Sequence, residues 1–477
     1  MVSCSSPGLT GLPGGGYPQK VMSTIPSSPT PPSPSRPATA VILAAGRGTR
    51  MRSERPKVMH PLAGRPMLRH LLDNAEQVFD HIVVVVGPGM EDVAALAAPH
   101  AVVVQADRLG TAHAALQAQA YFGTGDVAVL YGDNPLITAQ TMRDLLACRR
   151  QPGVGLALLA MRPAHPGRYG RVVTQGDNVV RIVEWADATP QERAIDLCNA
   201  GVLCADAQDF RRWLNEVRND NAQGEYYLGD VVTQAVADGV CVRAVVASED
   251  ELRGINSRAE LAVAEASVQQ RLRHGAMERG VTLVAPDTVF LCADTVLAPD
   301  VVIHPHVVFG PGVTVERDVE VRSFSHLEGC TVRQGALIGP YARLRPGSDV
   351  GARAHVGNFV ELKATTLGEG AKANHLTYLG NAQVGARTNV GAGTITCNYD
   401  GVFKHATVIG EGSFIGSDSI LVAPVTLGAG VITAAGSVIT KDVPDDAMAF
   451  GRVRQQDNRA GYAKAFRKRL MTAKERG

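Results

Sequence analysis

The chain has 477 residues, too many for a single hydrophobic core, so we expect two or more domains. Its 47 Lys and Arg residues balance 46 Asp and Glu residues, which excludes a general attraction to nucleic acid or an anionic membrane. No apolar run approaches the roughly 20 residues that span a bilayer, and the eight scattered cysteines form no CxxC pair, which predicts reduced thiols in a cytoplasmic protein.

Residues 1–38 form the first segment, which ends in SSPTPPSPSRPA and is rich in Ser, Pro and Gly. The segment lacks the apolar stretch of a signal peptide. We therefore expect a disordered extension without a part in the fold.

From residue 39 to about residue 250, short apolar runs alternate with helical stretches: AVILAA, PMLRHLLDNAEQV, HIVVVVG, TAHAALQAQAYF and VAVLYGD. This order is typical of a Rossmann-like α/β domain with a mostly parallel sheet. The runs Ile82–Val86 and Val127–Leu130 suit strands that are buried on both faces. Ligands of such sheets bind beyond the carboxyl ends of the strands, where the glycine-rich loop and the YGD segment both fall.

Residues 251–280 contain NSRAELAVAEASVQQRLRHGAMERG, whose apolar positions recur every three to four residues. Ser257 and Glu260 have the spacing of a capping box. This segment therefore predicts a helix that links two domains.

Residues 281–453 have apolar positions that recur every six residues. Three runs carry the period: Val284, Phe290, Val296, Val302 and Val308; Val332, Ile338, Leu344, Val350, Val356 and Leu362; and Ile409, Ile415, Leu421 and Leu427. Such a repeat predicts a parallel β-helix in which each side of a triangular coil takes one hexad and the apolar residues stack inside. The period slips around Val315, Lys363–Leu379 and Asn398–Lys404, where we expect loops to leave the coil.

A basic tail, residues 454–477, closes the chain with RAGYAKAFRKRLMTAKERG. A solvated helix is one interpretation of its charge, and contact with a ligand phosphate is the other.

The segment GRGTRMRSERPK follows the first predicted strand. Its glycines would allow backbone N–H groups close to phosphate oxygens, and Arg50 and Lys57 add the charge that a nucleoside triphosphate requires. The segment matches neither GxxxxGK[ST] nor the dinucleotide motif GxGxxG. A nucleotide site of another type is therefore predicted.

The longer pattern LAAGxGTRM…PK, which begins at Leu43, resembles the fingerprint of sugar nucleotidyltransferases. From about Thr39 to Tyr462 the chain is similar to the bacterial bifunctional N-acetylglucosamine-1-phosphate uridyltransferase/glucosamine-1-phosphate acetyltransferase family. The resemblance implies an α/β nucleotidyltransferase domain at 39–250, a linker helix at 251–280 and a left-handed parallel β-helix of hexapeptide repeats with acetyltransferase activity at 281–453. It also implies Mg²⁺ as cofactor, acetyl-CoA and UTP as co-substrates, glucosamine-1-phosphate and N-acetylglucosamine-1-phosphate as sugar substrates, and a homotrimer without nucleic-acid or membrane partners.

For uridylyl transfer, the resemblance implies that Arg50 and Lys57 act on the phosphates in catalysis. It further implies that Asp133 and Asn256 bind the metal. The full set of nucleotide- and sugar-binding residues is then Leu43, Ala44, Ala45, Gly46, Lys57, Gln105, Gly110, Thr111, Tyr131, Gly132, Asp133, Gly170, Glu184, Asn199 and Asn256.

Simpler structural interpretations of these residues stay open. The two metal ligands could merely cap the turns that follow them, Glu184 could be a solvated charge, and Asn199 could form an Asx turn. Two residues depart from the family pattern: Gly229 in EYYLGD stands where threonine is usual, and Trp185 stands where a smaller or more polar residue is common. Both departures bear on the shape of the sugar pocket.

Acetyl transfer to an amine needs a base and donors that stabilise the tetrahedral oxyanion. His375, in HLTYLGNA, is the candidate general base, although a lone histidine in a β-helix is more often a packed or corner residue. The resemblance implies that glucosamine-1-phosphate is bound by Arg345, Lys363, Tyr378 and Asn389, and acetyl-CoA by Ala392, Asn398, Tyr399, Ser417, Ala435 and Arg452.

The predicted function is therefore acetylation of glucosamine-1-phosphate, followed by transfer of UMP from UTP to the product with release of pyrophosphate. One alternative makes the β-helix a regulatory or oligomerising module, as in the ADP-glucose pyrophosphorylases. Another makes it a zinc-binding β-helix like the γ-class carbonic anhydrases, with ligands drawn from His304, His306, His326, His355, His375 and His405.

Overall fold

The computed structural model of the protein describes residues 36–221, 223–453 and 460–476. Most of the extension predicted at residues 1–38, and the start of the basic tail, lie outside the described residues. No described helix is both long and apolar enough to cross a membrane.

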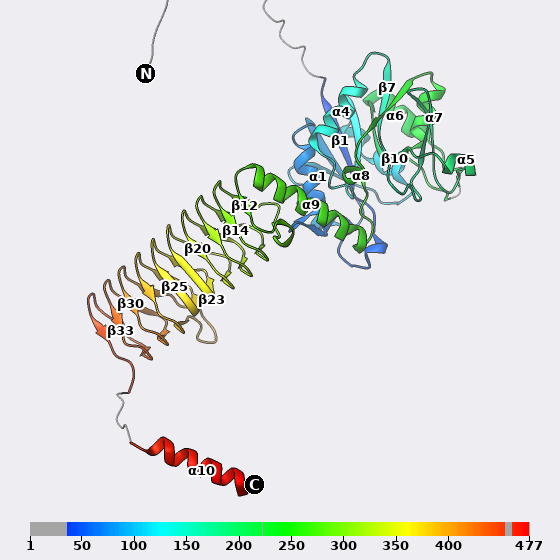
Figure 1. Cartoon of the computed structure of the whole chain (residues 1–477). Helices are drawn as coiled ribbons and strands as arrows, with labels where there is room; N and C mark the ends of the chain where they lie inside the picture. Colours follow the sequence, from blue (N-terminus) through cyan, green and yellow to red (C-terminus); the bar gives the residue numbers. More distant parts are fainter. Residues whose placement is uncertain (1–35, 222, 454–459, 477) are drawn as a thin grey trace, which may run out of the picture. The chain divides into compact units, whose positions relative to one another are not determined.

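The N-terminal part contains a sheet flanked by helices (Figure 1). Its nine strands have the order β5-β4-β1-β6-β10-β7-β11-β9-β8. Its strands are β1 (Ala38–Leu43), β4 (His81–Val86), β5 (Ala101–Val104), β6 (Asp126–Tyr131), β7 (Val154–Met161), β8 (Arg171–Gln175), β9 (Asn178–Val183), β10 (Cys198–Asp206) and β11 (Cys241–Val246). The first four strands in this order are parallel, and β10 runs antiparallel to both of its neighbours, β6 and β7. The mostly parallel α/β sheet predicted from the sequence is confirmed.

Helices alternate with these strands along the chain. They are α1 (Met67–Ala75), α2 (Glu91–Ala97), α3 (Thr111–Gln117), α4 (Ala139–Arg149), α5 (Pro190–Arg193), α6 (Ala207–Glu216), α7 (Asp230–Ala237), α8 (Glu249–Leu252) and α9 (Arg258–Glu278), with α10 (Tyr462–Arg476) near the end of the chain. Short 3₁₀ turns occur at η1 (Thr49–Met51), η2 (Lys57–Met59), η3 (Gln119–Tyr121) and η4 (Pro286–Thr288).

The central strands contribute side chains to two hydrophobic cores, one on each face of the sheet. Val41 of β1 belongs to the same core as Trp213 of α6, whereas the next residue, Ile42, belongs to the core that contains Leu71 of α1. Successive strand residues point to opposite faces, so a strand covered on both faces has a continuous apolar run. The predicted run Ile82–Val86 is accordingly buried throughout.

A tight hairpin joins β2 (Pro61–Leu62) to β3 (Arg65–Pro66), just before α1. Its two central residues, Ala63 and Gly64, have φ of 46° and 77°, as a two-residue hairpin turn requires. The Ala63 carbonyl accepts hydrogen bonds from the Cys292 thiol at 3.1 Å and from the Ala293 N–H at 2.8 Å. A Cβ on Gly64 would lie 2.4 Å from Cys292 Sγ, so this contact depends on glycine.

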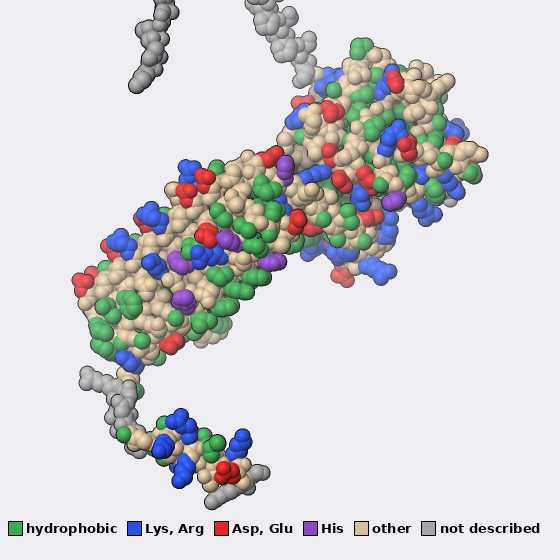
Figure 2. All heavy atoms as spheres, viewed as in Figure 1, with side chains coloured by type: hydrophobic (Ala, Val, Ile, Leu, Met, Phe, Trp, Pro, Cys, Tyr) green, Lys and Arg blue, Asp and Glu red, His purple; other side chains and the backbone are tan. Residues whose placement is uncertain are grey.

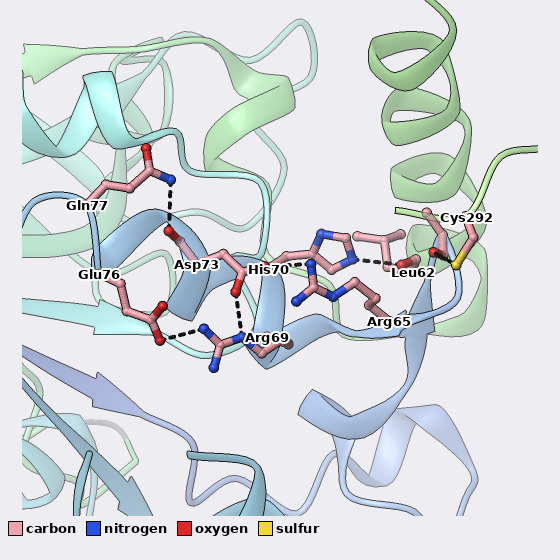
Figure 3. Close-up of polar contacts among 9 residues, drawn as sticks. Leu62, Arg65, Arg69, His70, Asp73, Glu76, Gln77 and Cys292 are labelled. Carbon is pink, nitrogen blue, oxygen red and sulfur yellow. Dashed lines mark hydrogen bonds and ion pairs between the residues drawn. The ribbon is translucent and has the colours of Figure 1, made fainter. Parts of the chain in front are cut away.

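Side chains of α1 hold the base of this hairpin (Figure 3). The ring of His70 is hydrogen-bonded to the Leu62 carbonyl at 2.7 Å. Arg69 binds both Asp73 and Glu76 along the same helix. The chain that leaves η2 is therefore fixed between α1 and the segment that begins at Cys292.

The helix α9 begins at the predicted cap. Ser257 Oγ accepts from the Glu260 N–H at 3.2 Å, but the Glu260 carboxylate accepts from the Asn256 N–H at 2.6 Å and not from Ser257. The capping box is thus half formed, and its second half fixes the backbone of Asn256.

A parallel β-helix follows α9, in agreement with the predicted fold class (Figure 1). Two of its faces share one sheet because β23 (His355–Lys363) and β25 (Lys372–Gly380) each continue around a corner. The first face also has β12 (Thr282–Leu283), β14 (Val302–Ile303), β17 (Glu320–Val321), β20 (Leu337–Ile338), β27 (Asn389–Val390), β30 (Phe414–Ile415), β33 (Ile432–Thr433) and β35 (Met448–Ala449).

The other two faces complete the triangular coil. The second face also has β15 (Val308–Phe309), β18 (His326–Leu327), β21 (Arg343–Leu344), β28 (Ile395–Cys397), β31 (Ile420–Val422) and β34 (Val438–Ile439). The third has β13 (Val296–Leu297), β16 (Thr314–Val315), β19 (Cys330–Val332), β22 (Ser348–Val350), β24 (Thr366–Leu367), β26 (Ala382–Val384), β29 (Thr407–Ile409) and β32 (Val425–Leu427).

The predicted register of the first hexad run is wrong by one residue. Val284, Val296 and their partners in that run face outward, with Val296 57% exposed, whereas Leu297 beside it is 7% exposed and packs in the core. Early hexads carry two adjacent apolar residues, so the six-residue period alone cannot tell which one points inward. The second and third predicted runs, from Val332 and from Ile409, are buried as expected.

Only one of the three predicted loops leaves the coil. Residues 398–406 form a loop between β28 and β29, with a bridge from Tyr399 to Lys404. Around Val315 and across Lys363–Leu379 the strands continue without such a loop. The slip at Lys363 reflects a side that is one residue shorter, from Leu362 to Leu367, whereas the buried Phe309, Val315 and Val321 keep the six-residue spacing. The apparent slip at Val315 therefore comes from the wrong register of the first run.

Candidate active site

A cleft of about 300 Å³ opens at the carboxyl ends of β1 and β6. Because Leu43 pairs with Tyr131 in these parallel strands, the loops that follow them lie side by side. The cleft brings together most of the predicted nucleotide-binding residues: Leu43, Ala44, Ala45, Gly46, Lys57, Gln105, Gly110, Thr111, Tyr131 and Asp133. Gly132 lies in the same turn, where its N–H donates to the Leu43 carbonyl at 2.9 Å.

Lys57 lies at the centre of this site. Its ammonium contacts the Asp133 carboxylate and donates to Asn256 Oδ1 at 3.0 Å. A Cβ on Gly48, which has φ of 63°, would lie 2.6 Å from Lys57 Cβ. Glycine therefore permits the loop that follows β1, called the phosphate loop below (residues 46–57), to fold back closely on this lysine. Two side-chain oxygens, one from Asp133 and one from Asn256, therefore surround the Lys57 ammonium.

These two oxygens also suit a divalent metal. Magnesium is bound through one or two protein oxygens, with phosphate and water completing its shell. Asp133 and Asn256 offer a carboxylate and an amide oxygen at the place where Lys57 already supplies positive charge. Among the described residues, no three His, Cys, Asp or Glu side chains cluster in a way that could hold a metal.

The loop between β5 and α3 forms another wall of the cleft. Gln105, which is buried, donates to the Gly110 carbonyl at 3.1 Å, and Thr111 Oγ1 accepts from the Leu228 N–H at 2.9 Å. Gly110 has φ of 122°, and a Cβ there would lie 2.5 Å from the Tyr226 carbonyl. This loop therefore keeps a rigid shape.

Arg108 is a residue of the cleft that the sequence analysis missed. It lines the cleft, and its Nε donates to the Ala45 carbonyl at 2.8 Å. By contrast, Arg50 is exposed on η1 and is not among the residues that line the cleft. Arg108 therefore adds a guanidinium to the wall of the cleft, in addition to the predicted Lys57.

The predicted sugar residues lie near this cleft: burial raises the pKa of Tyr131, which lines the cleft, and the charge of Glu184 adds to that shift. Glu184 lines a second cleft, of about 550 Å³, together with Asp187 and Asp230. Burial, with the charges of Asp230 and Asp187, raises the pKa of Glu184. Gly170 lies against Glu184 and accepts from the Asn199 N–H at 2.8 Å, which connects the three predicted residues.

The simpler interpretation of Asn199 is realised in part, because its Oδ1 accepts from the Gly201 N–H at 2.9 Å, as in an Asx turn. Gly229 has φ of −59°, and an added Cβ would meet Ile182 at 3.4 Å, an ordinary contact. The backbone therefore does not demand glycine at that position.

Two guanidinium groups contact the ring of Trp185. Arg171 and Arg193 lie over its ring at 4.9 and 4.8 Å from the centroid. These cation–π contacts fix the tryptophan beside Glu184.

The predicted acetyltransferase residues gather at the corner between the first two faces of the β-helix. His375, Ala392, Ser417 and Ala435 occupy equivalent positions on successive coils, each directly before a residue with positive φ. Backbone hydrogen bonds connect these coils. The carbonyls of His375, Ala392 and Ser417 accept, at 3.4, 2.7 and 2.7 Å, from the N–H groups of Gly393, Asp418 and Gly436 on the next coil. One column therefore contains the candidate base and three of the predicted acetyl-CoA residues.

The remaining predicted acetyl-CoA residues lie near the same part of the β-helix. Asn398 donates through Nδ2 to Asn381 at 2.7 Å, and Tyr399 is exposed in the loop at 398–406. Arg452 lies next to the end of the column, beside Gly436.

The predicted phosphate-binding residues of the second site lie on the neighbouring face. Arg345 donates to Glu361 at 2.8 Å, and this contact raises the pKa of Arg345. Lys363 lies beside Lys404, whose contact and charge lower the pKa of Lys363. Lys404, which the sequence analysis missed, therefore adds a third cation to this group.

Tyr378 and Asn389 lie on opposite sides of the corner, on β25 and β27. Tyr378 follows Glu361 in the ladder of the second face, whereas Asn389 follows Lys372 in that of the first. Tyr378 and Asn389 thus flank the His375 column, one on each of the two faces that meet there.

Comparisons with known proteins cover both parts of the chain. A family model of the MobA-like NTP transferase domain matches residues 40–196, and one of bacterial transferase hexapeptide repeats matches residues 406–441. The bifunctional protein GlmU of Gluconacetobacter diazotrophicus is 73% identical over 95% of this chain and 99% of that protein. This chain belongs to the GlmU family.

Two further GlmU proteins extend the match. Those of Granulibacter bethesdensis and Acidiphilium cryptum are 64% and 62% identical, over 92% and 87% of this chain and 98% and 95% of their own lengths. The chain is accordingly a bifunctional GlmU enzyme that combines uridylyl transfer with acetyl transfer, as the sequence predicts. An inactive, purely regulatory β-helix is not favoured.

Proposed function

We propose that the chain acetylates glucosamine-1-phosphate at the β-helix and then uridylylates the product at the cleft of the α/β domain, with Mg²⁺ as the metal. The observation that supports this assignment most strongly is the separation of the two residue sets. The phosphate cleft with Lys57 and Asp133 and the column with His375 are built from different elements of one chain. The product of the second site, N-acetylglucosamine-1-phosphate, is then the sugar substrate of the first.

In uridylyl transfer, a phosphate oxygen of the sugar phosphate forms a bond to the α-phosphorus of UTP, and the bond to pyrophosphate breaks. No protein nucleophile is needed, so alignment and charge neutralisation provide most of the rate. Lys57 and Arg108 supply charge from the cleft, with Arg50 from the phosphate loop, and the rigid loop from Gln105 to Thr111 holds the base. Asp133 and Asn256 would hold Mg²⁺, which supplies further charge neutralisation at the phosphates.

In acetyl transfer, the amine of glucosamine-1-phosphate attacks the thioester carbonyl, and the thiolate of coenzyme A leaves. His375 takes the proton of the amine. Arg345, Lys363 and Lys404 bind the sugar phosphate, and the column from Ala392 to Ala435 binds the coenzyme along successive coils.

We also propose a homotrimer whose copies meet along the corner beside His375. His306, Phe324, Tyr341 and Phe359 stack there on successive coils with centroids 4.9, 5.0 and 5.1 Å apart, and they are largely exposed. Figure 2 shows hydrophobic and histidine side chains gathered along one side of the β-helix. Contiguous apolar surface of this kind marks protein interfaces. Sedimentation of the wild type and of Phe324→Asp tests this assembly: a monomeric wild type contradicts it.

The domain boundaries 39–250, 251–280, 281–453 and 454–477 are part of the proposal. They agree with α9 at Arg258–Glu278 and with the first β-helix strand at Thr282. We further propose a cytoplasmic location, in keeping with the described cysteines, none of which forms a disulfide.

Product analysis tests the function directly. Purified protein is given glucosamine-1-phosphate, acetyl-CoA, UTP and Mg²⁺, with each co-substrate omitted in turn. We expect UDP-N-acetylglucosamine only in the complete mixture, and N-acetylglucosamine-1-phosphate when UTP is omitted. Formation of the nucleotide sugar without acetyl-CoA, or no acetylated sugar at all, contradicts the proposal.

A further inference from the structure

The ring of His375 is hydrogen-bonded to the coil that precedes it. Asn358 of β23 lies opposite His375 of β25 in the parallel ladder, and its Oδ1 lies 2.9 Å from His375 Nδ1. Figure 1 shows these two strands side by side. Asn358 thus extends the His375 column by one coil, away from the acetyl-CoA residues.

The backbone around this contact is tightly held. Thr377 Oγ1, which is buried, donates to the His375 carbonyl at 2.7 Å. A Cβ on Gly357 would lie 2.0 Å from the Asn374 carbonyl oxygen, so the two coils approach closely just before Asn358. The relative position of the amide and the imidazole is therefore fixed by the coil itself.

The contact selects one protonation pattern of the imidazole. The amide oxygen of Asn358 only accepts hydrogen bonds, so the shared proton lies on His375 Nδ1. A neutral imidazole carries one N–H, which leaves the lone pair on Nε2. His375 is exposed, and no residue in the described part of the chain is hydrogen-bonded to its Nε2.

We infer that Asn358 is a positioning residue for acetyl transfer, which keeps His375 in the Nδ1–H tautomer and directs Nε2 toward the amino sugar. This inference rests on the proposed role of His375 as the general base. Because the amide is neutral, it orients the ring without adding a negative charge that would hold the proton on the imidazolium. Release of that proton after each turnover is therefore not opposed by a carboxylate at this position.

Other charged and titratable groups lie on the strands packed against His375. They are His355, Glu361 and Lys363 on β23, and Lys372 and Tyr378 on β25. All of them stay unchanged when only Asn358 is replaced, so variants at this one position isolate its effect on the pH profile.

Two substitutions test the inference. Asn358→Leu removes the acceptor, and we expect kcat for acetyl transfer to fall by roughly tenfold or more while KM for both substrates changes little. Asn358→Asp keeps an acceptor for Nδ1–H, so most of kcat should return. Its carboxylate should also move the acid limb of the kcat profile to higher pH by roughly one unit.

Circular dichroism and thermal unfolding of the same samples report whether the β-helix of each variant is folded, and uridylyl transfer reports the state of the α/β domain. Gln383→Leu removes an exposed amide from the third face of the β-helix and should leave acetyl transfer unchanged. Full kcat with an unshifted pH profile in both Asn358 variants overturns the inference. If Asn358→Leu does not fold, the inference is tested by Asn358→Asp alone: an acid limb of the kcat profile that does not move to higher pH overturns it.

His375→Ala, measured in parallel, separates this inference from the proposed function. An inactive His375→Ala with fully active Asn358 variants refutes only the positioning role. An active His375→Ala refutes the general base itself.

Discussion

Replacing Lys57 with methionine removes the ammonium that lies between Asp133 and Asn256 while keeping a side chain of similar length. We expect Lys57→Met to bind Mg²⁺ more tightly than the wild type in the absence of nucleotide. In the wild type, a metal at Asp133 has to compete with the lysine for the same two oxygens. The variant has no such competitor and leaves the Asp133 carboxylate without its cation.

The magnitude follows from the two contacts. The Lys57 and Asp133 side chains are only 13% and 16% exposed, so solvent screens the pair incompletely. Hydrogen bonds to charged groups contribute about 1.5–3 kcal/mol net. A change of about 2 kcal/mol corresponds to roughly 30-fold tighter Mg²⁺ binding.

Titration calorimetry with Mg²⁺, or Mn²⁺ titration followed by electron paramagnetic resonance, measures this affinity without turnover. Asp133→Ala removes the proposed ligand and gives the background. Lys363→Met makes the same chemical change in the β-helix and should leave metal affinity unaltered. Mg²⁺ binding that is unchanged or weaker in Lys57→Met refutes the competition between lysine and metal.

Three further predictions test the fold and the two clefts. Gly110→Ala places a Cβ 2.5 Å from the Tyr226 carbonyl, so we expect a stability loss of about 1–3 kcal/mol and a raised KM for UTP, whereas Gly123→Ala, also at positive φ but in open space, should cost less. Burial and nearby carboxylates raise the pKa of Glu184, so ionisation of this carboxyl opposes folding, fully above the raised pKa and not at all below the ordinary pKa. Glu184→Gln should therefore raise Tm at pH 8, and the gain should shrink as the pH falls from the raised pKa toward the ordinary one. A gain that grows on acidification contradicts this sign. Leu297→Ala should cost about 2–5 kcal/mol in denaturant unfolding and Val296→Ala less than about 0.5 kcal/mol, and the reverse order would support the register first predicted.

The phosphate cleft could be predicted because its residues lie in short motifs. LAAGxGTRM and YGD each follow a strand of the parallel sheet, and the topology brings those strand ends together. Arg108 could not be predicted, because a single arginine in a loop is not distinctive in the sequence and only the folded loop brings its side chain to the Ala45 carbonyl.

The β-helix could be predicted from its period, but its register could not. Adjacent apolar residues such as Val296 and Leu297 satisfy the same six-residue spacing, and packing alone separates them. The column that contains His375, Ala392 and Ser417 has unequal spacings in sequence because a loop intervenes at 398–406. The residues of this column could therefore be predicted only from the resemblance to a known family, and not from the six-residue period.

Asn358 shows the same limit. In NFVELK it looks like an ordinary turn residue, and its contact with His375 depends on the number of residues in one coil, 17 in this case. That number becomes known only when each side of the coil has been assigned.

Mixing two variants tests the two-site function most directly. His375→Ala and Asp133→Ala are each given glucosamine-1-phosphate, acetyl-CoA, UTP and Mg²⁺, first alone and then together. We expect neither variant alone to make UDP-N-acetylglucosamine and the mixture to make it, because each supplies the step that the other lacks. A mixture of folded variants that makes no nucleotide sugar, or a single variant that makes it unaided, would contradict two separate sites on one chain.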